Sequence, residues 1–281
     1  MDKKEPQTPY EKLCWLVGRL RDPGGCPWDR EQTKVSLKPF VLEEAYEVVE
    51  AIDDPNPEAL REELGDLMYQ ILFLAKMAHE KGEFDLDDVW THAYEKLYNR
   101  HPHVFGEVKL DSSGDVLKNW DKIKAIEKKH TRESILDGLP QTLPALLRAQ
   151  RIQERASRVG FDWNHLDPAM EKVKEEMGEF HQAIEEKNPA AIEDEMGDVL
   201  FALVNVARFL KVNPELALQN TVKKFTRRFK YIEVEAKKAG KKLEEMDLIE
   251  MDELWNQAKK LETKDNGELK NPELPEGKET L

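Results

Sequence analysis

The chain has 281 residues, enough for one large domain or two modest ones, with 40% hydrophobic residues and only 14 Gly and 15 Pro. This composition excludes wholesale disorder and collagen-like repeats. The 57 acidic residues outnumber the 43 basic ones and give a net charge of −14, so we expect no nucleic acid partner unless basic residues cluster.

Apolar residues recur at three- and four-residue spacing along nearly every long segment, and no run alternates with period two for long enough to predict a strand. The sequence therefore predicts an all-α fold. Segments rich in Pro and Gly interrupt this periodicity, as at residues 22–29 and 101–113, where we expect loops. In chain order, the pattern predicts helices through residues 13–20 and over 38–52, 58–78, 86–100, 115–129, 145–159, 169–187, 190–211, 214–239 and 248–261.

The segment at residues 132–144, which contains DGLPQTLP, marks the expected domain boundary, because the series of helices starts over beyond it. We expect a first helical domain over residues 8–131 and a second over 140–262. The polar remainder, residues 263–281, is expected to be a disordered tail.

The sequence favours a cytoplasmic protein. Cys14 and Cys26 are too few for a disulfide framework, and no second pair accompanies them for zinc. The polar beginning of the chain lacks an apolar leader, and the longest apolar runs, residues 67–75 and 199–210, are shorter than the ~18 residues of a membrane span. We therefore expect no membrane partner.

Acidic motifs of the first half recur in the second half at a shift of 132 residues, which indicates duplication. The corresponding pairs are Glu43 and Glu175, Glu44 and Glu176, Glu47 and Glu179, Glu63 and Glu195, and Asp66 and Asp198. Basic and aromatic pairs follow in the same order: Lys96 and Lys224, Arg100 and Arg228, Trp120 and Trp255, and Lys124 and Lys259. Both halves thus carry EExxE, ExxD, KxxxR and WxxxK.

The spacing of the acids points to a cation site. Residues three and four apart share a helix face, so EExxE crowds like charges at a cost of a few tenths of a kcal/mol per pair. A solvated acidic face would explain one such motif. However, the turn at Asn188 and Pro189 folds two helices antiparallel and brings EExxE level with ExxD. Converging carboxylates need a counter-charge, and hard oxygen ligands suit Mg²⁺ or Mn²⁺.

Two other metal chemistries find little support in the sequence. A di-iron site needs two ExxH motifs on facing helices, and only Glu127 with His130 has that spacing. His101 and His103 lie in a Pro-containing segment without a set of partner ligands, so we interpret them as loop residues.

The basic motifs suit phosphate binding. Lys224 and Arg228 share one helix face, as do Trp255 and Lys259. Cations that face a metal across a phosphate chain complete the charge neutralisation that phosphoryl chemistry requires, and an indole could stack a base. A solvated basic face and a core tryptophan are the structural alternatives for these residues.

The order and spacing of these motifs, with YNRHPHVFGEV closing the first half and RAQRIQERASRVGFDW opening the second, resemble the MazG family of nucleoside triphosphate pyrophosphohydrolases over residues 10–260. The resemblance implies two tandem all-α domains built on four-helix-bundle elements, in a protein that is commonly a homodimer. It also implies Mg²⁺-dependent hydrolysis of nucleoside triphosphates to monophosphate and pyrophosphate, with broad base tolerance, to clear aberrant or surplus nucleotides.

The resemblance also implies roles for individual residues. It assigns metal binding to Glu176, Glu179, Glu195 and Asp198, with Glu175 and Asp194 assisting a second ion or the attacking water. It assigns catalytic phosphate binding to Lys224 and Arg228, and the lining of the nucleotide pocket to Trp255 and Lys259. In the first half the same roles fall to Glu44, Glu47, Glu63, Asp66, Lys96, Arg100, Trp120 and Lys124.

One difference separates the halves: Asn205 stands in an apolar run on the face of Asp198, where the first half has Phe73. A buried amide needs partners, which a phosphate or sugar could supply, so we predict that the second domain is the main catalytic one. Two alternatives remain: a nucleotide-binding regulatory protein without turnover, and a narrow-substrate enzyme of the dUTP or phosphoribosyl-ATP hydrolase type. Apolar surface on residues 67–78 and 200–210 favours a homodimer.

Overall fold

The computed structural model describes residues 6–128 and 133–265. Within these ranges the chain is all-α, with no strand, as the sequence predicts. The contacts divide it into two compact units, Met1–Lys129 and His130–Leu281, here called unit 1 and unit 2. The predicted limits of 8–131 and 140–262 stay predictions. The last helix extends to Asp265, and the rest of the predicted tail lies outside the described residues.

Three of the long helices of unit 1, which begin at Pro9, Pro57 and Leu86, start with a local capping signal. Thr8 forms a capping box with Glu11, Asp85 forms one with Asp88, and the Asn56 side chain accepts a hydrogen bond from the Glu58 backbone N–H. The helices are α1 (Pro9–Arg21), α2 (Pro27–Glu31), α3 (Lys38–Ala51), α4 (Pro57–Glu80), α5 (Leu86–Arg100), α6 (Pro102–Phe105) and α7 (Ser113–Lys128).

The short helices α2 and α6 correct the prediction of loops at 22–29 and 101–113. Each has Pro at its first position, where the fixed φ of the ring favours helix and the missing N–H costs no hydrogen bond. Runs of four or five residues are too short for periodicity to reveal them.

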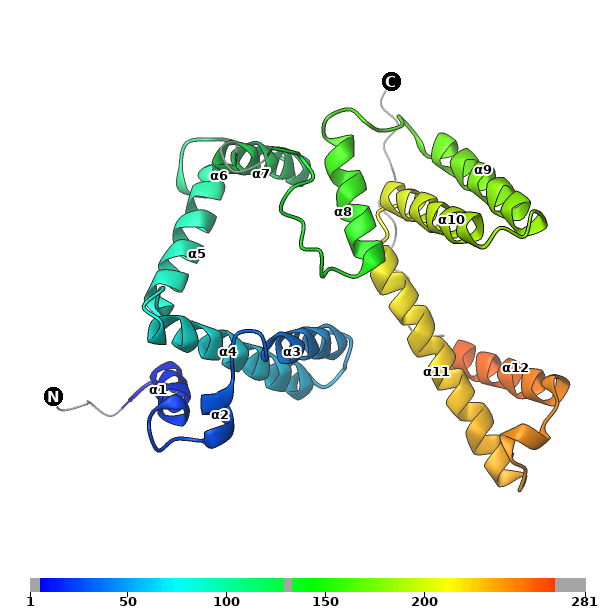
Figure 1. Cartoon of the computed structure of the whole chain (residues 1–281), viewed down its shortest axis with the longest axis horizontal. Coiled ribbons are helices and arrows are strands. Elements are labelled where there is room, and N and C mark those ends of the chain that lie inside the picture. The colour runs from blue at the N-terminus through cyan, green and yellow to red at the C-terminus, as the bar shows by residue number, and fades with distance from the viewer. Residues whose placement is uncertain (1–5, 129–132, 266–281) are drawn as a thin grey trace. The chain divides into compact units, whose positions relative to one another are not determined.

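The core of unit 1 lies where α1 packs on α4 and α4 packs on α3 (Figure 1). Its buried residues are Val17, Leu37, Leu72, Phe73 and Met77. Phe73 is 1% exposed, and the partly buried rings of Phe40 and Tyr69 pack against this cluster. The α3–α4 pair is therefore filled with large apolar side chains beyond its acidic end.

Two long helices of unit 2, which begin at Pro189 and Pro214, also start at capping residues. Asn188 and Asn213 each accept a hydrogen bond from a backbone N–H of the first turn, and Pro follows each of them. The elements are α8 (Ala145–Ser157), α9 (Leu166–Glu185), α10 (Pro189–Phe209), α11 (Pro214–Lys238), the 3₁₀ turn η1 (Leu243–Glu245) and α12 (Leu248–Asp265).

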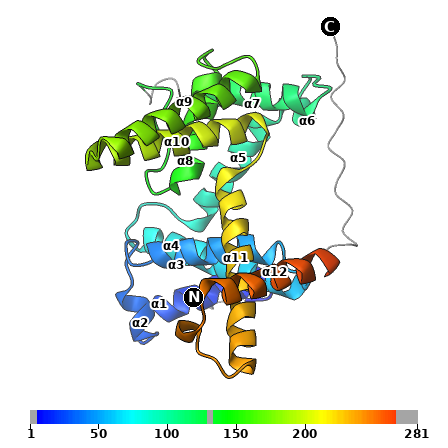
Figure 2. The ribbon, with the colours of Figure 1, turned by 90° about the vertical axis from the view of Figure 1, so that its right-hand side faces the viewer.

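The turn between α9 and α10 makes them an antiparallel pair. Lys187 closes α9 in the left-handed region, at φ 54°, one residue before the cap of α10. In unit 2, α10 packs on α9 and α8, and α11 lies beside α12 (Figure 2). The buried apolar residues of unit 2 are mostly small and include Ala169, Ala183 and Ala202, in contrast to the large buried residues of unit 1.

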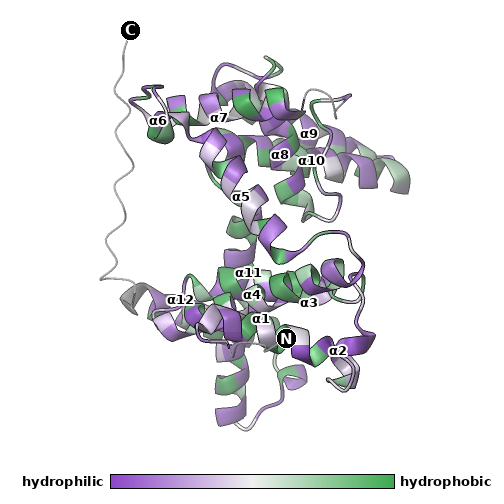
Figure 3. Ribbon diagram, turned by 90° about the vertical axis from the view of Figure 1, so that its left-hand side faces the viewer, coloured by the Kyte–Doolittle hydropathy of each residue, from purple (hydrophilic) through white to green (hydrophobic). Residues whose placement is uncertain are grey.

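Large apolar side chains remain exposed on α4 and α10, whose hydrophobic stretches Figure 3 shows. On α10, Leu200, Phe201 and Leu203 are 46%, 43% and 47% exposed. Such surface is available for packing against another protein surface. None of the described helices combines the length and the apolar character that spanning a bilayer would require.

Candidate functional site

The α9–α10 pair of unit 2 brings three carboxylates together. Glu176 and Glu179 of α9 and Glu195 of α10 each place one oxygen within 4.8 Å of the other two. Glu176 is only 6% exposed, and Glu195 Oε2 is buried without a hydrogen-bond partner. A buried acceptor of this kind calls for a cation or a donor that the protein does not itself provide.

The electrostatics of unit 2 agree with this geometry. Burial raises the pKa of Glu195, and the neighbouring carboxylates, first Glu179 and then Asp198, raise it further. Three carboxylates that repel one another and include an unpartnered oxygen fit a hard divalent cation such as Mg²⁺.

Lys172 is a neighbour of these acids that the sequence analysis missed. Its Nζ lies 2.8 Å from Glu176 Oε1 and 2.7 Å from Glu175 Oε1, and these two hydrogen bonds raise the pKa of Lys172. The i, i+3 and i, i+4 spacing along α9 was the signal that could have revealed it. The lysine compensates part of the charge of Glu176.

The other predicted acids of unit 2 lie around this group. Glu175 is exposed and paired with Lys172. Asp194 and Asp198 are exposed and share a shallow hollow on α10. Asp198 also faces the larger cavity described next.

A cavity of about 670 Å³ opens beside the acids of unit 2, between α8, α9, α10 and the α8–α9 loop (residues 158–165). Glu176 and Asp198 stand on its wall, and the rings of Phe161, Trp163 and Phe201 supply apolar surface. A concave, mostly apolar space with a few convergent polar groups is typical of a small-molecule site. The rings of this cavity suit a ligand that contains a flat ring, and its two carboxylates suit a cation.

Three polar residues that line this cavity, Asp162, Asn205 and Arg208, form a connected set. Arg208 donates from Nε to Asn205 Oδ1 at 2.9 Å and from Nη1 to Asp162 Oδ2 at 2.9 Å, and its Nη2 donates to Asp162 Oδ1. The predicted Asn205 therefore lines the cavity, as its place on the face of Asp198 suggested. Asp162 and Arg208 were not predicted, because no local pattern links residues 46 positions apart.

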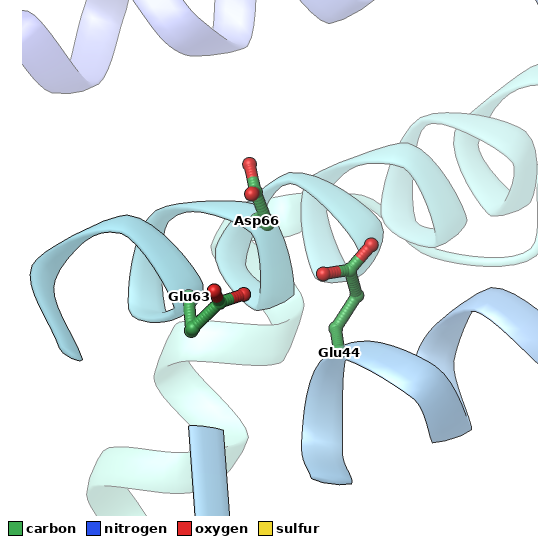
Figure 4. A group of neighbouring side chains, drawn as sticks. All are labelled: Glu44, Glu63 and Asp66. Atoms are coloured by element: carbon green, nitrogen blue, oxygen red, sulfur yellow. The ribbon is translucent and has the colours of Figure 1, made fainter. Parts of the chain in front are cut away.

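Unit 1 also gathers three carboxylates. Glu44 of α3 lies with Glu63 and Asp66 of α4, with one oxygen of each within 4.8 Å of the others (Figure 4). Burial raises the pKa of Glu44, although the hydrogen bond that Gln70 donates to it at 3.3 Å opposes the shift. Glu47 is exposed and is not one of the three. The group resembles that of unit 2 but draws two of its members from the second helix.

The surroundings of this group differ from those in unit 2. At the shift of 132 residues, Phe40 takes the place of Lys172, Tyr69 that of Phe201, and Phe73 that of Asn205. These rings belong to the core of unit 1. A pocket of about 520 Å³ in unit 1 lies instead along α1, α4 and the start of α5, and the three carboxylates do not line it.

The basic and aromatic motifs of unit 2 form a separate cluster. Arg228 of α11 donates to Glu262 Oε2 of α12 from Nε at 2.8 Å and from Nη2 at 2.7 Å, and its guanidinium lies 5.3 Å from the Trp255 ring centroid. The hydrogen bonds from Arg228 lower the pKa of Glu262. Lys224 and Lys259 lie on the same two helices. The described residues that line the cavity do not include the four predicted contacts Lys224, Arg228, Trp255 and Lys259. Their roles stay predictions.

Unit 1 repeats this cluster. Arg100 of α5 donates to both carboxylate oxygens of Glu127 of α7, and the Lys124 ammonium lies 5.2 Å from the Trp120 ring centroid. Lys96 lies on α5, one turn before Arg100. In each unit, an arginine of one helix thus pairs with a glutamate of the helix that carries the motif tryptophan. The sequence did not predict the pairing of Glu127 or of Glu262.

Comparison with known proteins matches the MazG nucleotide pyrophosphohydrolase domain to residues 32–105 and 166–232, which contain both groups of carboxylates. The nucleoside triphosphate pyrophosphohydrolase/pyrophosphatase MazG of Thermotoga maritima is 46% identical over 256 residues, 91% of this chain and 98% of the relative. A nucleoside triphosphate pyrophosphohydrolase of Escherichia coli strain K12 is 45% identical over 258 residues, 90% and 97% of the two chains.

Proposed function

Since the chain belongs to the MazG family of nucleotide pyrophosphohydrolases, we propose that it hydrolyses nucleoside triphosphates to nucleoside monophosphate and pyrophosphate. The observation that carries this proposal is the cavity of unit 2, whose wall includes Glu176 and Asp198. A base and sugar in the cavity would extend their phosphates toward the carboxylates. The names of the two relatives support the same chemistry for this chain.

Mg²⁺, or Mn²⁺ in its place, is the proposed cofactor. Glu176, Glu179 and Glu195 would hold it, with Asp198 on the cavity side and Glu175 and Asp194 nearby. When bound, such an ion polarises phosphate oxygens and lowers the pKa of a water ligand. The fit rests on the unpartnered Oε2 of Glu195 and on the mutual repulsion of the three acids.

The protein's own residues supply binding and orientation. Lys172 is placed to neutralise a carboxylate or a phosphate oxygen at the mouth of the acidic group. We retain Lys224, Arg228, Trp255 and Lys259 as proposed nucleotide contacts. Because the cavity wall is mainly aromatic and aliphatic, it would accept several bases, which fits broad base tolerance and the clearing of aberrant or surplus nucleotides.

Unit 2 is the proposed main catalytic unit. The large rings of Phe40, Tyr69 and Phe73 occupy the corresponding places in unit 1, so unit 1 would bind a cation without taking up a nucleoside in the same way. This observation favours a sensing or assembly role for unit 1 within an active enzyme. We also propose a cytoplasmic homodimer that packs through exposed apolar surface such as that on α10.

One assay tests the proposed activity. Pyrophosphate and nucleoside monophosphate release is measured from a panel of ribo- and deoxyribonucleoside triphosphates, with Mg²⁺ and with a chelator. We expect release from most of the panel in Mg²⁺ and none in the chelator. No release from any nucleotide would overturn the enzyme proposal in favour of binding without turnover, and release from only one would favour a narrow-substrate enzyme.

The proposed assembly has its own measurement. Sedimentation at micromolar concentration should show a dimer, and substitution of Leu200 and Leu203 by Lys should shift it toward monomer. A monomeric wild-type protein would contradict the homodimer proposal without affecting the assay above.

A further inference from the structure

Asn205 presents a defined hydrogen-bonding group to the cavity of unit 2. Its Oδ1 accepts the Nε–H of Arg208 at 2.9 Å. Arginine has only donors, so this contact fixes which end of the amide faces the arginine. The Nδ2 group makes no hydrogen bond to another described residue, and it is the end left for a ligand.

Asp162 holds the arginine in turn. Both carboxylate oxygens of Asp162 accept hydrogen bonds from the two terminal nitrogens of Arg208, in the paired geometry that is most specific for guanidinium. The side chains are 23% and 14% exposed, so bulk water screens the pair only in part. Because Asp162 neutralises Arg208, the arginine is poorly suited to bind a phosphate. Its hydrogen bond to Oδ1 instead orients the amide of Asn205.

We propose that Asp162 and Arg208 are positioning residues that lock the amide of Asn205 as a donor toward the nucleotide base, so that unit 2 prefers bases with a carbonyl oxygen at that edge over bases with an amino group. The inference rests on the proposed function, since it assumes that the cavity receives the nucleoside. It concerns selectivity among bases that the cavity otherwise tolerates.

The preference follows from donor and acceptor matching. A carbonyl oxygen accepts from Nδ2, whereas an amino group would set N–H against N–H and lose the hydrogen bond. An unrestrained amide would rotate and serve both groups, but rotation here would turn Nδ2 toward the donor of Arg208. Since one neutral hydrogen bond distinguishes the two bases, we expect a preference of about three- to tenfold.

Unit 1 offers a matched control for the tether. Lys76 takes the place of Arg208 at the shift of 132 residues, and its Nζ lies 3.8 Å from Asp22 Oδ1 in the loop after α1. Phe73 stands at the place of Asn205, so this ion pair between the loop and α4 has no amide beside it at that place. Asp22→Asn therefore weakens the ion pair at the corresponding place in unit 1 and leaves the residues that line the cavity of unit 2 unchanged.

The test compares kcat/KM for two nucleotide pairs that differ by carbonyl against amino: inosine against adenosine triphosphate, and uridine against cytidine triphosphate. Full-length protein with Mg²⁺ should favour the carbonyl member of each pair by about three- to tenfold. Asn205→Asp should reverse the ratio, because its second oxygen accepts from an amino group. Arg208→Lys keeps the charge but loses the planar fork, and it should bring the ratio toward one. Asp22→Asn should leave the ratio unchanged.

Unchanged ratios in Asn205→Asp or Arg208→Lys would overturn the inference, as would losses that depend on ribose against deoxyribose and not on the base. Because each ratio is internal to one protein sample, partial unfolding of a variant does not alter it. Binding of inosine and adenosine monophosphate without metal, followed by calorimetry, gives the same ratio independently of turnover. A wild-type protein without turnover that still prefers inosine monophosphate would contradict the proposed function alone.

Discussion

Units 1 and 2 place three carboxylates on a pair of facing helices but surround them with different side chains. In unit 2 the acids border a cavity of about 670 Å³ that Asn205 and Lys172 help to line. In unit 1 the corresponding places carry Phe73 and Phe40, and Phe73 is 1% exposed. The same acidic motifs can therefore coexist with an open site or with a filled core.

The acidic pattern and the ligand space are therefore separate features of the repeat. The acids depend on helix spacing and on the turn that makes two helices antiparallel. The space for a ligand depends on the volume and polarity of a few side chains that lie one or two helix turns from the acids. Substitutions at matched positions in the two units can separate these contributions.

The largest expected effect is on stability at the position that distinguishes the two cores. Phe73→Ala should lower the unfolding free energy by about 3–5 kcal/mol, because it empties a buried aromatic site. Asn205→Ala should cost only about 1 kcal/mol, since it removes one hydrogen bond beside an existing cavity. Urea unfolding followed by circular dichroism measures both. Equal costs would contradict the contrast between a filled and an open interior.

The next effect concerns catalysis. Glu176→Ala should lower kcat/KM for pyrophosphate release about 100-fold or more, because loss of even an outer partner of a metal site costs about 10- to 100-fold. Glu44→Ala, the matched change in unit 1, should leave kcat/KM nearly unchanged, because unit 2 is the proposed catalytic unit. Thermal unfolding of both variants serves as the control. If Glu176→Ala retained turnover while Glu44→Ala abolished it, the catalytic unit would be unit 1.

A smaller effect is expected for the ion pairs between the basic and aromatic helices. Glu262→Gln should lower the unfolding free energy by about 1.5–3 kcal/mol, the range for hydrogen bonds to charged groups. Glu127→Gln should cost less, because the Glu127 side chain is 34% exposed and that of Glu262 is 17% exposed. Chemical denaturation of both variants provides the comparison, and a larger cost for Glu127→Gln would refute it.

The ion pair between Arg228 and Glu262 also predicts how the stability depends on pH. Arg228 lowers the pKa of Glu262 in the folded protein, so the carboxylate stabilises the fold above its unfolded pKa of about 4.3. That contribution is lost as the pH falls through the lowered folded value. The stability difference between wild type and Glu262→Gln should therefore shrink below about pH 4.

The smallest effect concerns the lysine that unit 1 lacks. Lys172→Met removes a cation 2.8 Å from Glu176, so Mg²⁺ without nucleotide should bind about two- to fivefold more tightly, the range for partly exposed charge pairs. Lys174→Met makes the same charge change on α9, at a lysine that pairs with Glu171 instead. Titration calorimetry compares them, and equal affinities in the two variants would show that net charge alone matters.

The sequence predicted the main helices and the register of the acids well because both depend on local spacing. Residues three and four apart share a helix face, and the turn at Asn188 sets Glu176 level with Glu195. Membership of each group was less predictable. Asp66 is one of the three acids of unit 1, whereas its counterpart Asp198 lies on the cavity wall of unit 2, because packing settles the side-chain rotamers.

Amino-acid order by itself determined the all-α class, the duplication and the acidic character of both helix pairs, since these follow from periodicity and from the constant shift between the halves. Only the tertiary structure decided that Asp162 and Arg208 meet across 46 positions to hold Asn205, and that Arg228 faces Glu262. The physical reason is that local spacing governs which residues share a helix face. The space between helices, and the partners across it, depend on how side chains of different size fill the same backbone arrangement.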